Sequence, residues 1–245
     1  MAKKSTDRDR KAKIAEMQRQ AKAAERRRTL LIVGTAVVVV ALIAGAVGFA
    51  ILRDDSRVPG GSLTSLGVAA SAASCDPPTT DKATGNSVHV GPGTDKANVT
   101  RVKYSTVPPT SGEHFATPEF PARDFYTGDD RPKMETLVHN LEHGYTVLWY
   151  DSTASDKQQA TLKAVAKQAK ASDAAKDKFI VSAWDPSYGA LPGGKHFALS
   201  HWAADPKDLS KQSGHRQLCG DLSGDVVQKF VTAYPRTMAP EPNAQ

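Results

Sequence analysis

Cysteine is scarce in this sequence, since its 245 residues include only Cys75 and Cys219. There is no C-x-x-C motif, so dithiol redox chemistry is not expected, and neither cysteine has a second one at the spacing of a thiolate zinc motif. In an oxidising compartment an isolated pair most simply forms a disulfide. A Cys75–Cys219 bond would close a loop of about 145 residues and fix both ends of one domain.

Most of the chain has no excess of positive over negative side chains, although the formal net charge is +6. Residues 1–28 carry eleven Lys or Arg against four Asp or Glu, whereas residues from 53 onward carry twenty-one basic and twenty-two acidic residues. The basic character is therefore confined to one end, and no nucleic-acid partner is expected. We predict that residues 1–29 form a basic cytoplasmic tail that orients the segment after it.

Charged side chains are absent from residues 30–52, LLIVGTAVVVVALIAGAVGFAIL. As a helix this stretch would be roughly 35 Å long, enough to cross the hydrocarbon core of a bilayer. No signal-peptide cleavage site follows it directly, and the preceding basic residues place the N-terminus in the cytoplasm. The sequence thus predicts a single-pass plasma-membrane protein, with the lipid bilayer as a partner and an extracytoplasmic C-terminal domain.

Large apolar residues are rare in residues 53–74, which we predict to be a flexible tether. Residues 75–236 are the predicted globular domain, and residues 237–245 a disordered tail. The element pattern predicts an α/β fold, either a two-layer α+β arrangement or a thioredoxin-like order without C-x-x-C. The predicted strands cover residues 87–90, 99–104, 145–150, 178–184 and 196–202, and the last two are expected to be antiparallel. The predicted helices cover residues 132–143, 155–171 and 223–234.

The predicted helix over residues 132–143 carries the most informative motif. Met134, Leu137, Val138 and Leu141 follow the i, i+3, i+4, i+7 spacing of one buried helical face, and a glycine at 144 suits the residue after a helix end. The alternation of apolar residues through 137–149 also permits one continuous strand. The helix is the reading that we adopt, and the chemistry of the motif depends on it.

The residues His139-Asn-Leu-Glu142-His143 have the form H-x-x-E-H, in which two histidines hold zinc and the glutamate is a general base. On a helix the two imidazoles lie roughly 6 Å apart and can share a metal, whereas on a strand they would be roughly 13 Å apart. His114 is a candidate third ligand. The candidate metal ligands are therefore His139, His143 and His114, for zinc or copper, with Glu142 as the candidate catalytic base. The alternative is that the histidines only hydrogen-bond the end of the helix.

A proline-rich loop over residues 107–125 precedes this helix and begins with VPPTSGEH. Loops held on a rigid scaffold often carry function. Ser111 could be a nucleophile with a histidine as its base and Glu142 as orienting group, but the G-x-S-x-G elbow of serine hydrolases is absent, and the residue equally suits a turn. The remaining histidines are interpreted as surface or packed side chains rather than ligands: His89, His196, His201 and His215.

The two motifs PPTSGEH and VHNLEHGYTVLWYD, behind a membrane anchor and a basic N-terminus, resemble the bacterial, mainly actinobacterial, membrane-anchored family of domains of unknown function numbered 3105 (DUF3105). The resemblance covers residues 75–245, with Glu113 where the family motif has proline. It implies placement in the cell envelope and a shared pocket formed by Pro108, Pro109, Ser111, Gly112, His114, His139, Asn140, Glu142, His143 and Gly144.

Three functions are open at this point. The first is a binding or accessory module of the cell envelope whose His/Glu pocket holds a metal or small ligand. The second is a zinc-dependent hydrolase that uses the H-x-x-E-H motif. The third is a structural domain that acts through contacts with an envelope protein partner. Convergence of imidazole nitrogens would favour the first two over the third.

Overall fold

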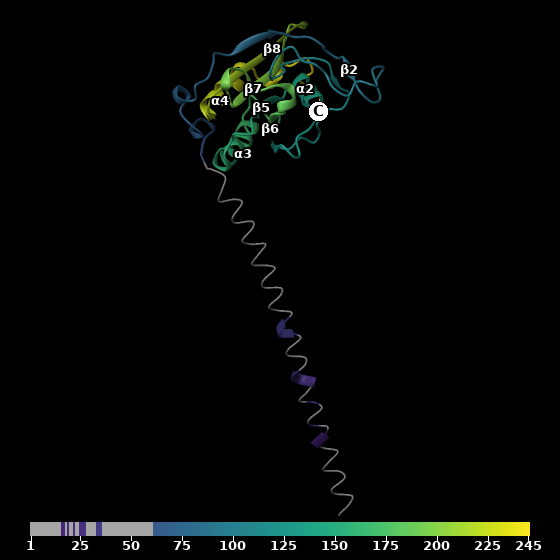
Figure 1. Ribbon diagram of the computed structural model, residues 1–245, viewed down its shortest axis with the longest axis vertical. Helices are drawn as coiled ribbons and strands as arrows, with labels where there is room; N and C mark the ends of the chain where they lie inside the picture. The colour runs from purple at the N-terminus through teal and green to yellow at the C-terminus, as the bar shows by residue number, and fades with distance from the viewer. Residues whose placement is uncertain (1–15, 18, 20–21, 23–24, 28–32, 36–60) are drawn as a thin grey trace, which may run out of the picture. The chain divides into compact units, whose positions relative to one another are not determined.

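The computed structural model describes residues 61–245 together with residues 16–17, 19, 22, 25–27 and 33–35. The chain divides into two compact units, and the second, Val58–Gln245, contains the globular domain (Figure 1). Apart from residues 33–35, the predicted membrane helix over 30–52 lies outside the described residues, as does most of the basic tail over 1–29. Within the described part of the chain, no helix is long and apolar enough to cross a membrane.

A six-stranded mixed sheet forms the centre of the domain, with the strand order β1-β8-β7-β5-β6-β4. Strands β4, β5 and β6 run parallel, and β7, β8 and β1 continue the sheet by antiparallel pairing. A separate parallel pair joins β2 to β3. The strands are β1 (Thr79–Lys82), β2 (His89–Val90), β3 (His114–Phe115), β4 (Phe125–Tyr126), β5 (Thr146–Tyr150), β6 (Phe179–Ala183), β7 (Phe197–Asp205) and β8 (Asp208–Cys219).

Helices cover both faces of this sheet, so its central strand β5 is buried on both sides. Leu148 and Tyr150 face a core formed with α3 and α4, whereas Val147 and Trp149 face a second core formed with α2. The expected two-layer arrangement is therefore too simple, although the mixed α/β class is confirmed. The helices are α2 (Met134–Glu142), α3 (Asp156–Lys170) and α4 (Gly224–Ala233), with short 3-10 turns at Leu63–Ser65, Ala70–Ala72, Pro186–Tyr188, Pro192–Gly194 and Arg236–Met238.

Helix α2 confirms the predicted helix and excludes the alternative strand. Its apolar face, which includes Leu137, Val138 and Leu141, is buried against the sheet. Gly144 follows the helix with a φ of 93°, and a Cβ there would lie 2.5 Å from the carbonyl oxygen of Arg236. Only glycine combines this left-handed conformation with so close a backbone approach. The helix therefore ends at Glu142, and the chain turns directly into β5.

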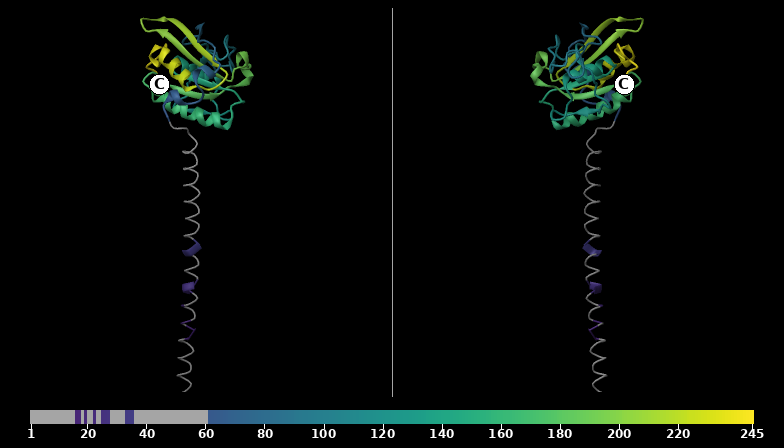
Figure 2. Two further views of the ribbon diagram at one scale, coloured as in Figure 1. Left: turned by 90° about the vertical axis from the view of Figure 1, so that its left-hand side faces the viewer. Right: turned by 90° about the vertical axis from the view of Figure 1, so that its right-hand side faces the viewer.

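The long hairpin of β7 and β8 extends past the end of β5, with which only Phe197–His201 of β7 pair (Figure 2). The strands over 178–184 and 196–202 run antiparallel to each other as predicted, with β5 between β6 and β7. The predicted strand over 99–104 differs, since these residues lie outside the sheets. Strands β1, β3, β4 and β8 are additions to the elements that the sequence predicted.

Both ends of the domain are longer than the sequence suggested. Leu63 and Leu66, in the predicted tether, are buried in the core beside α4. The predicted disordered tail is fixed as well, since Lys178 Nζ donates hydrogen bonds to the carbonyl oxygens of Pro242 and Ala244. Three kinds of contact therefore order these ends, namely apolar burial, backbone acceptors and the disulfide described next.

The predicted disulfide between Cys75 and Cys219 is confirmed. It joins the end of β8 to the segment before β1, across a sequence separation of 144 residues. Cys219 is buried in the core of α3 and α4, and the next residue, Gly220, donates its amide to the carbonyl oxygen of Ala73. The covalent bond thus strengthens a junction that hydrogen bonds and packing also hold.

Replacing both cysteines by alanine should lower the free energy of unfolding, because the unfolded chain regains the entropy of an open loop. The chain-entropy model sets an upper limit of about 4–5 kcal/mol for a loop of this size. Denaturant unfolding followed by circular dichroism measures the change. The wild-type protein under reducing conditions is the control and should match the double variant; equal midpoints for the oxidised, reduced and substituted proteins would contradict the prediction.

Candidate metal centre

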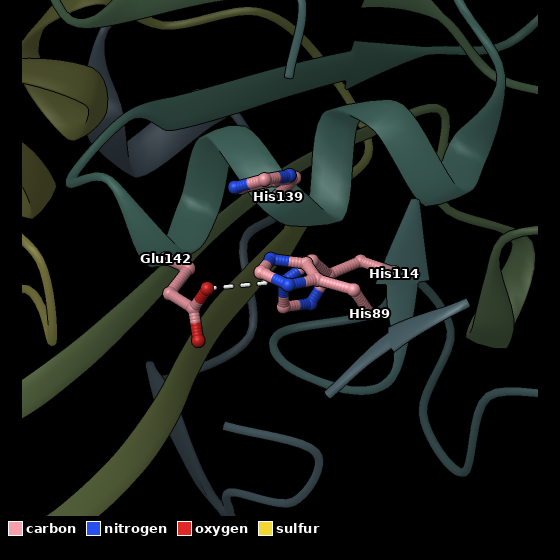
Figure 3. A group of neighbouring side chains, drawn as sticks. All are labelled: His89, His114, His139 and Glu142. Atoms are coloured by element: carbon pink, nitrogen blue, oxygen red, sulfur yellow. Dashed lines mark ion pairs between the residues drawn. The ribbon is translucent and has the colours of Figure 1, made fainter. Parts of the chain in front are cut away.

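Four side chains converge on one point between α2 and the β2–β3 pair: His89, His114, His139 and Glu142 (Figure 3). One ligand atom of each lies within 4.8 Å of the ligand atoms of the others. His114 and Glu142 are fully buried, His139 is 4% exposed, and His89 is exposed. Three imidazoles and one carboxylate at this spacing form a donor set for a transition-metal ion.

Two simple geometric relations bring these side chains together. Within α2, Glu142 follows His139 by three residues, so both side chains project from the same face of the helix. In the parallel β2–β3 pair, His89 lies directly opposite His114. The ring centroids of His89, His114 and His139 are then 4.6–5.0 Å apart.

The protein fixes the orientation of the two buried imidazoles through their Nδ1 atoms. Nδ1 of His114 lies 2.7 Å from the carbonyl oxygen of Gly112, and Nδ1 of His139 lies 2.6 Å from that of Phe115. A carbonyl oxygen only accepts hydrogen bonds, so each Nδ1 carries the proton and donates it. In a neutral ring, Nε2 then keeps its lone pair, and backbone carbonyls commonly orient metal-binding histidines in this way.

His114 and Glu142 form a buried pair in which no aligned hydrogen bond joins the two facing atoms. Nε2 of His114 lies 3.0 Å from Oε2 of Glu142, yet neither buried atom has a hydrogen-bond partner of acceptable alignment. Because Nδ1 carries a proton, Nε2 faces the carboxylate oxygen with an N–H group when the ring holds a second proton and with a lone pair when it does not. Two buried acceptors this close repel one another unless a proton or a cation lies between them. A metal ion bound by both atoms would satisfy both.

The charge states of these groups also suit a cation. Burial and the neighbouring His114 lower the pKa of His139 to about 4, so its imidazole is neutral at pH 7. Burial acts to raise the pKa of Glu142, but His114 and the backbone amide of Ser87 outweigh it and hold the pKa below its usual range. The site therefore contains a buried carboxylate and a neutral imidazole, which are the forms that bind metals.

Residues of the proline loop orient His114 and stabilise the loop that precedes it. Gly112 supplies the carbonyl group that orients His114, and a Cβ at this position would lie 2.7 Å from the ring of Tyr104. Oγ of Ser111 accepts a hydrogen bond from the backbone amide of Thr84, which is the loop-stabilising role of a turn residue. Pro108 and Pro109 are buried, and Pro109 also lines a surface groove of about 410 Å³.

Asn140 fastens the proline loop to α2. Its Oδ1 accepts a hydrogen bond from the backbone amide of Glu119, and its Nδ2 donates one to the carbonyl oxygen of the same residue. Asn140 is fully buried, so both bonds are shielded from water. This side chain holds the loop, and with it the His114 strand, against the helix that carries His139 and Glu142.

The structure directs His143 away from the four converging side chains. Its Nδ1 lies 2.5 Å from the carbonyl oxygen of Gln245, and its Nε2 lies 3.5 Å from a carboxylate oxygen of Glu241. The ring touches that of His139 edge-on, with centroids 4.4 Å apart. His143 therefore contacts Glu241 and Gln245. His89, and not His143, is the third histidine of the cluster.

His89 is the donor that sequence reasoning set aside. Its strand has two residues, and its partner His114 lies twenty-five positions later, so no local periodicity links them. The usable signal was the histidine inside a predicted strand over 87–90, because a strand next to the proline loop could pair with it. The other histidines lie outside the cluster in the described part of the chain.

Replacing Asn140 by alanine should destabilise the domain, because the part-buried backbone amide and carbonyl groups of Glu119 would lose their hydrogen-bond partners. Each such group costs about 1–3 kcal/mol. Thermal and denaturant unfolding measure the loss. Asn98→Ala is the matched control, since Asn98 is exposed, and its effect should stay within about 0.5 kcal/mol. Equal stabilities of the two variants would contradict the role given to Asn140.

Comparison with protein-family models matches residues 95–245 to a family described as "Protein of unknown function (DUF3105)". Comparisons with curated proteins and with solved structures found no match. The matched region includes His114, His139 and Glu142 and begins after His89. Because the match covers more than half of the chain, this protein belongs to the DUF3105 family.

Proposed function

We propose that this protein is a metal-binding module of the cell envelope, which holds one divalent transition-metal ion between His89, His114, His139 and Glu142. The observation that carries the proposal is the buried pair formed by Nε2 of His114 and Oε2 of Glu142. The two atoms lie 3.0 Å apart, and neither has an aligned hydrogen-bond partner. A metal between them offsets the cost of burying the carboxylate and uses both lone pairs.

The donor types suit zinc or copper in the divalent state, which are the two ions that we propose. Imidazole nitrogens suit both ions, and a carboxylate is a harder ligand that both accept. Soft thiolate ligands are absent, because both cysteines of the chain form the disulfide. The site therefore lacks the sulfur donors that favour monovalent copper.

The position of Glu142 favours metal binding over zinc-dependent hydrolysis. A general base needs a free carboxylate oxygen beside a metal-bound water. Here Oε1 of Glu142 accepts a hydrogen bond of 2.6 Å from the backbone amide of Ser87, and Oε2 faces His114. His143, the second ligand of the hydrolase motif, contacts Gln245 and Glu241 instead. Glu142 is better placed as a ligand than as a base.

The proposal includes attachment to the plasma membrane, with the domain outside the cytoplasm. The uncharged stretch over 30–52, the basic residues before it and the disulfide support this placement. An envelope protein that gives or receives the metal is the corresponding partner.

The strand order supports a thioredoxin-like arrangement as the finer description of the fold. Parallel β4, β5 and β6 with antiparallel β7 and β8, in the order β8-β7-β5-β6-β4, form such a sheet, with α2 on one face and α3 and α4 on the other. The segment between β5 and α3 contains no cysteine, so the arrangement brings no dithiol chemistry with it. An experimental structure with a different strand order would exclude it.

Metal analysis of the full chain, purified without a metal-affinity step, tests the metal site. We expect close to one equivalent of zinc or copper in the wild-type protein, and loss of the metal in the His114→Ala/Glu142→Gln variant. Trp202 gives a second readout, because its buried ring lies edge-on to His114 with centroids 5.9 Å apart. Added divalent copper should therefore quench tryptophan fluorescence in the wild-type protein and far less in the variant.

The matched control is His143→Ala, which removes a histidine from the same helix end and leaves all four donor side chains in the chain. This variant should keep its metal, whereas His139→Ala should lose most of it. Loss of metal in His143→Ala would instead support the H-x-x-E-H pair. Metal-free protein at every stage, even after addition of zinc or copper, would contradict the proposed function. Circular dichroism confirms that each variant is folded.

Reporter fusions test the membrane placement. A reporter enzyme that is active only outside the cytoplasm should be active when it is fused after residue 60 and inactive when it is fused after residue 29, because the segment over 30–52 then separates the two points. Inactivity of both fusions, at equal expression, would contradict an extracytoplasmic domain.

A further inference from the structure

We propose that His89 is the exchangeable ligand of the metal site, so that the protein passes its metal to and from a second metal-binding partner instead of keeping it permanently. This inference rests on the proposed function and adds the route of metal transfer. It starts from an asymmetry among the four donors. Three are nearly or fully buried, whereas His89 is exposed.

The second asymmetry concerns how each donor is held. His114 and His139 donate Nδ1–H to backbone carbonyls, and Glu142 accepts the amide of Ser87. The ring of His89 contacts the rings of His114 and His139, and no hydrogen bond from the described residues fixes its nitrogens. Metal-binding histidines usually have such a bond, and its loss weakens binding. His89 is therefore the ligand that dissociates most easily.

The third observation is the way in which the segment that carries His89 is attached. Strand β2 belongs to a two-residue parallel pair outside the main sheet, and glycines with positive φ flank it at Gly85 and Gly91. On its outer side, Asn86 Oδ1 accepts a hydrogen bond of 2.6 Å from Nε2 of Gln212 on β8. This exposed bond and the bond from the Ser87 amide to Glu142 are the side-chain hydrogen bonds that restrain the segment.

These features make the His89 side the solvent-exposed side of the site. An incoming donor atom, from a chelator or from a partner protein, forms a bond to the metal as the bond from His89 breaks. The His89 lone pair returns to the imidazole, and the oxidation state of the metal does not change. His114, His139 and Glu142 would keep the ion bound until further incoming donor atoms replace them in turn.

Stopped-flow withdrawal of the metal tests this route. The full chain in detergent is loaded with one equivalent of divalent copper, EDTA is added in excess, and the recovery of tryptophan fluorescence reports release. We expect the release rate to rise in proportion to EDTA concentration, as direct attack on the bound metal requires. Asn86→Ala should speed release by roughly tenfold at unchanged copper stoichiometry, because it frees the His89 segment. Asn98→Ala is the matched control and should behave as the wild type.

Substitution of the ligand itself completes the test. His89→Ala should still bind one copper ion through three donors, with affinity reduced by at least about tenfold and faster release. His196→Ala, which removes a half-exposed histidine elsewhere, should change neither quantity. Release that is independent of EDTA concentration, or a His89→Ala variant with wild-type affinity and rate, would overturn the exchange role while leaving the metal site intact. Absence of copper binding in the wild type would instead refute the proposed function.

Discussion

The burial of one carboxylate, that of Glu142, is the constraint on which the site depends. A carboxylate without solvent exposure costs several kcal/mol unless other groups compensate its charge. One oxygen takes the backbone amide of Ser87, which ties the β2 segment to α2, and the other faces His114, which ties β3 to the same helix. The need to satisfy this group therefore explains why three separate segments meet where they do, and why imidazoles rather than apolar side chains surround it.

Local patterns in the sequence predicted helix α2 and its end, because the apolar spacing of Leu137, Val138 and Leu141 and the glycine at 144 act over a few residues. The disulfide was also predictable, since two cysteines leave one pairing. Strand β8 was missed because its residues, DLSKQSGHRQLC, are largely polar, and its pairing with β7 compensates through backbone hydrogen bonds. Such pairing depends on the partner strand and leaves little trace in the composition of β8 itself.

The site was predicted in part for the same physical reason. His139 and Glu142 share a helical face, and the proline loop brought His114 to attention. Three of the four residues of the cluster were therefore named from the sequence, with Glu142 as a candidate base rather than a ligand. His89 and His143 exchanged roles because both depend on contacts between distant segments. His89 meets His114 through a two-residue strand pair, and His143 meets the carbonyl oxygen of Gln245, 102 residues away. Residue spacing within one motif contains no information about either contact.

The packing of Leu63 and Leu66 beside α4 has a consequence for how the domain is made. The first buried residues of the domain need a helix that is among its last elements, Gly224–Ala233, and β1 needs β8 in the same way. A ribosome or an export channel delivers the chain from its N-terminus, so these early segments wait for the end of the protein before they can be buried. The domain therefore completes its fold only after its last helix has emerged, and long-range closure of this kind makes folding slow.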